Sequence, residues 1–266
     1  MDPCRLERGP AQGRPRPRAD GHHGVRRPAH RRAHDSHDRR PGRPREEARR
    51  VSHDEVTAAP VNETPPSPIA ARFRGFLPVI VDVETGGFNC ATDALLEMAA
   101  VFVRFNAAGD LEPAEHHRYI VKPFEGSRLD PASLQVTGID PFHPLRPAID
   151  EGEALRALFQ EVRKELKPSG CTRAVLVGHN SFFDLQFLNA AVERTGIKRN
   201  PFHPFSSFDT ATLAGVAYGQ TVLSRAVTAA GFEWQEDRAH SALYDAEMTA
   251  RLFCSVVNRF RSVYER

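Results

Sequence analysis

The most informative stretch of this 266-residue sequence is Leu77-Pro78-Val79-Ile80-Val81-Asp82-Val83-Glu84-Thr85-Gly86-Gly87. Its apolar start predicts a buried strand, and the two glycines predict where the strand ends. Residues two apart in a strand point to the same face, so the carboxylates of Asp82 and Glu84 should leave the core side by side. Two adjacent like charges need a compensating cation, and a hard divalent ion such as Mg2+ or Mn2+ suits ligands that are all oxygen. The stretch therefore predicts a metal site at a strand end.

Composition divides the chain unevenly. Residues 1–68 are rich in Arg, Pro, His and Gly and have few side chains to bury, so we expect a disordered extension. Residues 69–266 are long enough for one domain with a core. The extension has three readings: a nucleic-acid tether, a targeting segment, or translation from a misassigned upstream start. We favour the last, because Arg/Pro/His runs without Lys or aromatic residues are typical of compositional bias.

Charge alone does not point to nucleic acid. Residues 1–50 contain 15 Arg and 7 acidic side chains, whereas the formal charge of the whole chain is only +2. The predicted domain is therefore net acidic, and any binding of a polynucleotide has to depend on local basic patches and bound metal.

Targeting and redox signals are weak. The sequence shows neither the apolar core of a secretory signal nor an 18-residue apolar span, so we expect a soluble, cytoplasmic protein. Cys4, Cys90, Cys171 and Cys254 are far apart without a Cys-x-x-Cys pair, which favours reduced thiols over a disulfide framework or a zinc site.

Three strands joined by short turns should form an antiparallel meander. They are the quoted stretch, Leu95–Phe105, in which an apolar helix-like start leads into a β-branched tail, and His116–Val121. Two further strands follow, a fully apolar central one at Ala174–Gly178 and a short last one at Ser206–Asp209.

Helices are predicted between and after these strands from caps and apolar stripes. They are Asp130–Thr137, Glu153–Lys167, Phe183–Thr195, Ala211–Tyr218, Val222–Ala230 and Ser241–Phe260. This order predicts an α/β fold, a mixed five-stranded sheet with a meander plus parallel strands and with helices on both faces.

Two later motifs add carboxylates near strand ends. Asp184 follows Gly178-His179-Asn180 after the central strand, and Asp245 ends His240-Ser241-Ala242-Leu243-Tyr244-Asp245. A mixed sheet can bring these acids to the same edge as Asp82 and Glu84. An isolated Asp-x-Glu is usually a solvated strand edge and an isolated His at a helix start is usually a cap, so the argument depends on their joint occurrence in this order.

Together these motifs resemble those of a known family, the four-carboxylate 3′-to-5′ exonucleases with a catalytic His five residues before the last Asp (DEDDh). Within this family the resemblance is to the ribonuclease T group. The resemblance covers residues 72–260 and implies a ribonuclease H-like fold. The motifs that carry it are Asp82-Val83-Glu84-Thr85, Cys171-Thr172-Arg173, Asn200–Phe205, Phe208-Asp209-Thr210, Gly219–Ser224 and His240–Asp245.

The resemblance implies a role for each acidic residue. Asp82 would bridge two Mg2+ or Mn2+ ions, Glu84 and Asp245 would complete the first site, and Asp184 would act through water at the second. His240 would take the proton from the attacking water, because an imidazole titrates near neutrality and can act as a general base. A sister subclass with Tyr as base is disfavoured, because Tyr244 directly precedes Asp245.

The resemblance also implies substrate contacts. Phe88, Phe183 and Phe205 match aromatic positions that stack on 3′-terminal bases. Val136 stands where the family has a further aromatic wedge, so the base clamp should be smaller. A basic patch that binds substrate for the partner's active site matches five residues, which implies a homodimer: Arg72, Arg74, Lys167, Arg173 and Lys198.

These motifs predict an exoribonuclease that trims short single-stranded 3′ ends of structured RNA, such as tRNA precursors, releases nucleoside 5′-monophosphates and also acts on DNA 3′ ends. The alternatives are a DNA proofreading or repair exonuclease and an inactive nucleic-acid-binding module on the same fold. A serine hydrolase and a phosphate-loop enzyme are disfavoured, because neither Gly-x-Ser-x-Gly nor a Gly-rich loop ending in Lys is present.

Overall fold

The structure is a computed structural model and describes residues 66–264. Most of the predicted extension, residues 1–65, lies outside this range. Helix α1 (Pro68–Arg72) begins at its N-cap Ser67, whose hydroxyl accepts a hydrogen bond from the backbone N–H of Ala70. The described fold therefore starts just inside the segment assigned to the extension.

The described residues form one five-stranded mixed sheet in the order β3-β2-β1-β4-β5. β1 pairs antiparallel with β2 and parallel with β4, which confirms the predicted meander followed by parallel strands. The strands are β1 (Phe76–Thr85), β2 (Leu95–Phe105), β3 (Leu111–Ile120), β4 (Arg173–Gly178) and β5 (Phe202–Asp209).

Three details of the strand prediction were wrong. Leu95 begins a strand without a helical start; β2 reads as an unbroken apolar run because it lies between β1 and β3 and is buried on both faces. β3 begins at Leu111 instead of His116, and β5 begins at Phe202 instead of Ser206. Both are edge strands, where exposed polar residues and even a proline such as Pro204 are tolerated.

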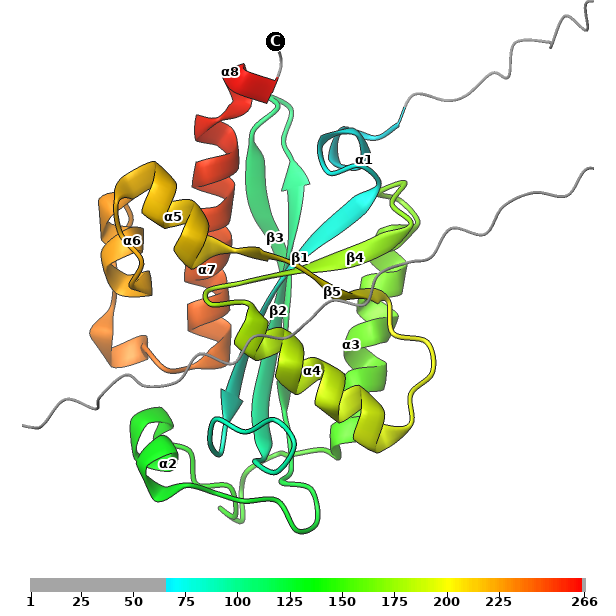
Figure 1. The fold of residues 1–266 in the computed structure, drawn as a ribbon, viewed down its shortest axis with the longest axis vertical. Coiled ribbons are helices and arrows are strands. Elements are labelled where there is room, and N and C mark those ends of the chain that lie inside the picture. Colours follow the sequence, from blue (N-terminus) through cyan, green and yellow to red (C-terminus); the bar gives the residue numbers. More distant parts are fainter. Residues whose placement is uncertain (1–65, 265–266) are drawn as a thin grey trace, which may run out of the picture. The chain divides into compact units, whose positions relative to one another are not determined.

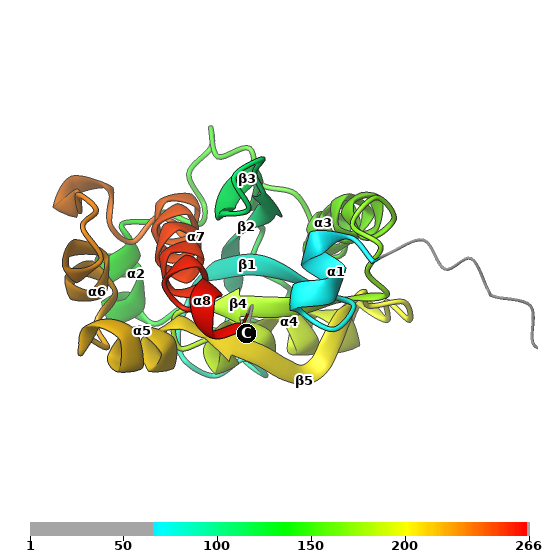
Figure 2. The ribbon, with the colours of Figure 1, turned by 90° about the horizontal axis from the view of Figure 1, so that it is seen from above.

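Helices cover both faces of the sheet, as predicted. α7 lies across β1, β2 and β3 and supports α5 and α6, whereas α3 and α4 pack on the opposite face (Figure 1, Figure 2). The helices after α1 are α2 (Pro131–Thr137), α3 (Glu151–Leu166), α4 (Phe182–Thr195), α5 (Thr210–Tyr218), α6 (Leu223–Ala229), the 3-10 turn η1 (Glu236–Arg238), α7 (Ala242–Arg259) and α8 (Arg261–Tyr264).

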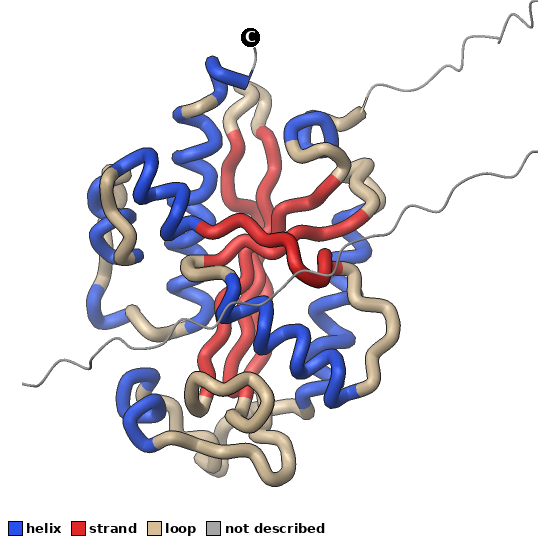
Figure 3. Tube along the Cα trace, in the orientation of Figure 1, coloured by secondary structure: helices blue, strands red, loops and turns tan. Residues whose placement is uncertain are grey.

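The core forms where these layers meet, with the strands crossing the middle of the domain and loops at their ends (Figure 3). Val79, Ile80 and Val81 of β1 are fully buried. Phe253 of α7 packs against Phe73 and Phe208, with ring centroids 6.1 and 5.7 Å away. The central strand is thus held between two apolar layers, which fixes the position of its carboxyl end.

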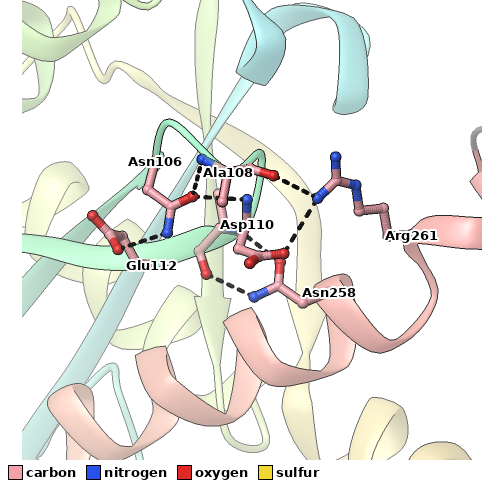
Figure 4. A network of polar contacts seen from close by, with 7 residues as sticks. Asn106, Ala108, Asp110, Glu112, Asn258 and Arg261 are labelled. Carbon is pink, nitrogen blue, oxygen red and sulfur yellow. Dashed lines mark hydrogen bonds and ion pairs between the residues drawn. The ribbon is translucent and has the colours of Figure 1, made fainter.

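A polar network fastens the far end of α7 to the turn between β2 and β3 (Figure 4). The Asn258 side chain accepts a hydrogen bond from the Leu111 backbone N–H (2.7 Å) and donates one to the Leu111 carbonyl (2.9 Å). Arg261 donates to the Ala108 carbonyl (2.9 Å) and pairs with Asp110. These contacts set the position of α7 along the sheet.

Among the described helices, none combines the length and the apolar character needed to cross a membrane. Within the same residues, Cys90, Cys171 and Cys254 are free thiols, as predicted, whereas Cys4 lies outside the described range.

We expect Asn258→Ala to lower the free energy of unfolding by about 1–3 kcal/mol, because it leaves the backbone N–H and carbonyl of Leu111 without their partners. Urea denaturation followed by circular dichroism measures this change. Asn189→Ala is the matched control, since Asn189 makes one exposed hydrogen bond, to the Pro204 carbonyl. An equal loss in both variants would contradict the anchoring role of Asn258.

Candidate active site

Three of the four predicted acidic residues converge at the carboxyl end of β1. One carboxylate oxygen from each of Asp82, Glu84 and Asp245 lies within 4.8 Å of the other two. Asp82 and Glu84 come from the strand itself, and Asp245 comes from the first turn of α7, which packs on β1. Residues far apart in sequence thus form one acidic cluster.

Asp184 completes this end of the sheet from a third element. β4 runs parallel to β1, and α4 follows it directly, so the first turn of α4 lies beside the end of β1. The Asp184 side chain is only 4% exposed, and its Oδ1 accepts a hydrogen bond from the Val83 backbone N–H at 3.1 Å. A Cβ at Gly178 would lie 2.9 Å from Asp184 Oδ2, so glycine is needed for this close approach.

Burial raises the pKa of each of these carboxyl groups, and repulsion from neighbouring acidic residues adds to the rise for Asp82, Glu84 and Asp184. The pKa of Asp82 lies well above its usual range because of burial and of the charges of Asp184, Asp245 and Glu84. Burial, with Asp245 and Glu97 nearby, raises the pKa of Glu84 to about 8. Burial raises the pKa of Asp245 to about 6. Such a cluster is stable in its charged form only with positive charge bound to it.

The donor set fits a divalent cation. Asp245 Oδ2 accepts a hydrogen bond from the His240 backbone N–H at 3.3 Å, whereas its buried Oδ1 has no hydrogen-bond partner among residues 66–264. A buried carboxylate oxygen without a donor suggests a missing ligand. All the candidate ligands are carboxylate oxygens, the type that Mg2+ and Mn2+ prefer. Asp82, Glu84 and Asp245 would hold the ion.

His240 lies at the turn that leads into α7. Its side chain is exposed, and its backbone has φ = 60°, a left-handed conformation that is costly for a residue with a Cβ. Tyr244, buried at 2% exposure, accepts a hydrogen bond from the Gln235 backbone N–H and so ties down the segment before the turn. The backbone of His240 is therefore held beside Asp245, and the residue remains exposed to solvent.

An aromatic cavity opens beside the acidic cluster. It has a volume of about 340 Å³, and Glu84, Phe88, Val136 and Phe183 contribute to its lining. Phe88 is 84% exposed and meets the Phe183 ring edge-on, with centroids 6.1 Å apart. Phe205 is also exposed but is not part of this lining.

The predicted basic residues lie elsewhere. Arg72 ends α1, Arg74 precedes β1 and Arg173 is the first residue of β4, so these three are at the amino ends of the parallel strands. Arg173 pairs with Phe76 of β1, and Asp82 is six residues further along β1 than Phe76, which is about 20 Å at the rise of a strand. Lys167 follows α3, and Lys198 lies between α4 and β5. Within one chain, the structure does not bring Arg72, Arg74 and Arg173 together with the carboxylates.

Glu97 is a further acidic residue near the site that the sequence motifs did not predict. This residue lies opposite Glu84 in the pairing of β1 with β2 and is 5% exposed. Arg118 of β3 donates to both of its carboxylate oxygens, at 2.5 and 3.2 Å. Glu97 adds to the field that raises the pKa of Asp82 and of Glu84. The signal was a lone acidic residue inside the apolar run of β2.

The fold and this site have a counterpart among known families. Residues 79–253 match the family model described as Exonuclease (RNase_T). The match covers well over half of the chain, so the protein belongs to this exonuclease family.

Solved structures share the fold of this domain. E. coli exonuclease I in complex with a dT13 oligonucleotide has a TM-score of 0.55 and 19% identity, over 71% of this chain and 43% of that one. A moderately thermophilic exonuclease I from Methylocaldum szegediense has a TM-score of 0.54 and 18% identity, over 71% and 42%. This chain thus matches less than half the length of these enzymes, and the likeness at such identity concerns the fold.

We expect the metal-free protein to lose stability as the pH rises from about 4.5 to about 8. Folded Glu84 has a pKa of about 8, against an ordinary value of 4.5, so it keeps a proton that the unfolded chain releases. The free energy of unfolding therefore falls with pH in this window. Urea denaturation in EDTA at several pH values measures the fall.

Glu84→Gln should flatten this pH dependence, and added Mg2+ should restore stability near the upper end of the window, because ion binding requires the deprotonated carboxylates. Glu193→Gln, an exposed position on α4, is the control and should keep the wild-type profile. A metal-free wild type that becomes more stable with rising pH would contradict this view of the site.

Proposed function

We propose that the protein is a metal-dependent 3′-to-5′ exoribonuclease that trims short single-stranded 3′ ends of structured RNA, such as tRNA precursors, and also acts on DNA 3′ ends. The observation that carries the proposal is the cluster of Asp82, Glu84 and Asp245, with Asp184 beside it, next to an aromatic cavity. The products are nucleoside 5′-monophosphates.

The chemistry follows from the charges that develop during hydrolysis. Attack by water on a phosphodiester places negative charge on the entering and leaving oxygens, and two bound divalent ions, Mg2+ or Mn2+, would supply the compensating charge. Asp82, Glu84 and Asp245 would hold these ions, and Asp184 would orient water. His240 accepts the proton of the attacking water, because it lies next to Asp245, to which its backbone N–H donates a hydrogen bond, and an imidazole can act as a general base.

The aromatic residues select a single-stranded end. The faces of Phe88 and Phe183 suit stacking of unpaired terminal bases, which a duplex end does not present. Phe205 is 80% exposed and offers a further ring. Val136 lines the same cavity with a smaller side chain, so the clamp on the last base is looser than an aromatic residue would make it.

A second candidate is a DNA exonuclease. It is favoured by the structural likeness to E. coli exonuclease I, whose structures include complexes with dT13 and dA16 oligonucleotides. The RNA proposal depends instead on the motifs that resemble the ribonuclease T group along residues 72–260.

We further propose a homodimer in which the basic patch of one protomer serves the site of the other. The separation of Arg72, Arg74 and Arg173 from Asp82 along β1 favours such an arrangement, because these cations are too far away to hold the end being cleaved in their own chain. Lys167 and Lys198 would extend the patch. We place the activity in the cytoplasm and assign it to residues 69–266, with residues 1–68 as an extension.

We expect Asp82→Asn to lower the rate of 3′ nucleotide release by more than about 100-fold, since it removes a ligand from the centre of the cluster. His240→Ala should lower kcat by about 10²–10⁴-fold with little change in KM, as expected for loss of a general base. Release of mononucleotides from a labelled oligonucleotide measures both effects, and EDTA should abolish the wild-type activity. Glu193→Gln is the control. Undiminished release in the Asp82 variant with EDTA present would refute both enzyme assignments.

Product mapping on a tRNA precursor with a 3′ overhang distinguishes the two enzymes. We expect trimming that stops within a few nucleotides of the stem, because the stacking rings require unpaired bases. The same overhang in DNA should be shortened as well. Digestion of single-stranded DNA with no cleavage of the RNA overhang would instead support the DNA exonuclease.

A further inference from the structure

The guanidinium of Arg194, in the last turn of α4, joins three other segments of the chain. Its Nε and Nη2 donate to both carboxylate oxygens of Glu151, at 3.1 and 2.7 Å, at the start of α3. Its Nη1 donates to the carbonyl of Cys90 at 2.8 Å. Its Cζ lies 4.2 Å from the ring centroid of Phe124. The guanidinium thus makes hydrogen bonds through its N–H groups and a cation–π contact through its face.

The ion pair between Arg194 and Glu151 is largely buried, which restricts the motion of both side chains. The Arg194 side chain is 21% exposed and that of Glu151 only 6%. A two-point pair between guanidinium and carboxylate fixes the orientation of both partners. The remaining nitrogen, Nη1, is thereby aimed at the carbonyl of Cys90, which lies in the loop between β1 and β2.

That loop carries Phe88, two residues before Cys90. At its base, the Gly86 carbonyl accepts a hydrogen bond from the Asp130 backbone N–H (2.6 Å), next to α2. Inside the loop, the Asn89 backbone N–H donates to Asp93 Oδ2 (2.9 Å). Arg194 supplies a connection from the other side of the loop to α4.

Phe88 has little packing of its own to hold it. The ring is 84% exposed and meets only the edge of Phe183 among the ring contacts of residues 66–264. Its position is therefore set by the backbone of the loop. Phe183, Asp184 and Arg194 all belong to α4, so one helix carries a wall of the aromatic cavity, an acidic residue of the site and the anchor of the opposite wall.

We propose that Arg194 is a positioning residue for recognition of the 3′-terminal base, acting through the Cys90 carbonyl to hold Phe88 at the stacking distance from Phe183. The inference rests on the proposed function, because it assigns Phe88 to the binding of a nucleic-acid end. Arg194 itself does not touch the reacting atoms.

A double-mutant cycle tests the proposal. Arg194→Ala, Phe88→Ala and the double variant are compared for 3′ nucleotide release from a single-stranded oligonucleotide. We expect each single variant to raise KM about tenfold, because the loss of one stacking contact between a base and an aromatic ring weakens binding by about this factor. The kcat should stay within about twofold of the wild-type value. In the Phe88→Ala background, Arg194→Ala should add less than about twofold. Arg194→Lys should restore little, since an ammonium lacks the planar fork.

Arg163→Ala is the matched control. Arg163 also extends from a helix, α3, to a backbone carbonyl, that of Arg199, and lies over the ring of Phe159, but none of these residues belongs to the loop of Phe88. It should leave KM unchanged. The same rise of KM in Arg163→Ala would overturn the proposal by showing a general effect of losing an arginine.

Hydrogen exchange gives a readout that does not depend on activity. Arg194→Ala should speed exchange of the amides of residues 87–93, whereas the amides of β1 and β4 keep their protection. Should Arg194→Ala fail to fold, Arg194→Met, which keeps a long apolar stem, takes its place. Unchanged exchange in the loop, or effects on KM that multiply in the double variant, would overturn the proposal. A wild type without nuclease activity would refute the proposed function instead.

Discussion

The main constraint on this structure is the removal from water of three carboxylates that lie close together at the end of β1. Asp82, Glu84 and Asp245 each have a raised pKa, and the first cause in each case is removal from water. At neutral pH the buried carboxylates therefore lower the free energy of unfolding, and a bound cation raises it again. No Lys or Arg side chain pairs with the cluster among the ion pairs of the described residues, so its negative charge is free to bind a metal ion.

The rest of the domain holds this cluster in place. β1 is the middle strand of the sheet, and the layers on its two faces bring in α7 with Asp245 and α4 with Asp184. Close contact is possible because Gly178 has no side chain where Asp184 approaches. The Asn258 contacts at the other end of α7 serve the same purpose at a distance, because a rigid helix transmits its position to its first turn.

The aromatic cavity is built differently from the acidic cluster. The acidic residues are buried or half-buried and are positioned by β1 and the helices packed on the sheet, whereas Phe88 is exposed and positioned by a loop. This arrangement suits a site that must hold metal ions constantly but admit and release a strand end at each turnover. The side chain of Arg194 joins the two parts, since it connects the loop to the helix that carries Asp184.

The central strands and the acidic residues could be predicted from the sequence, because each depends on a pattern within a short segment. Alternation along Val81 to Gly87, the glycine-bounded run at Val175 to Gly178 and the spacing of His240 and Asp245 predicted the central strands, the sheet and the four acidic residues. The edge strands were predicted less well, since an exposed strand has no strict hydrophobic pattern. Glu97 opposite Glu84, the contacts of Arg194 and the distance of Arg72 from Asp82 are decided by the packing of segments far apart in sequence. No local pattern contains these relations, because they exist only when the strands pair and the helices pack against them.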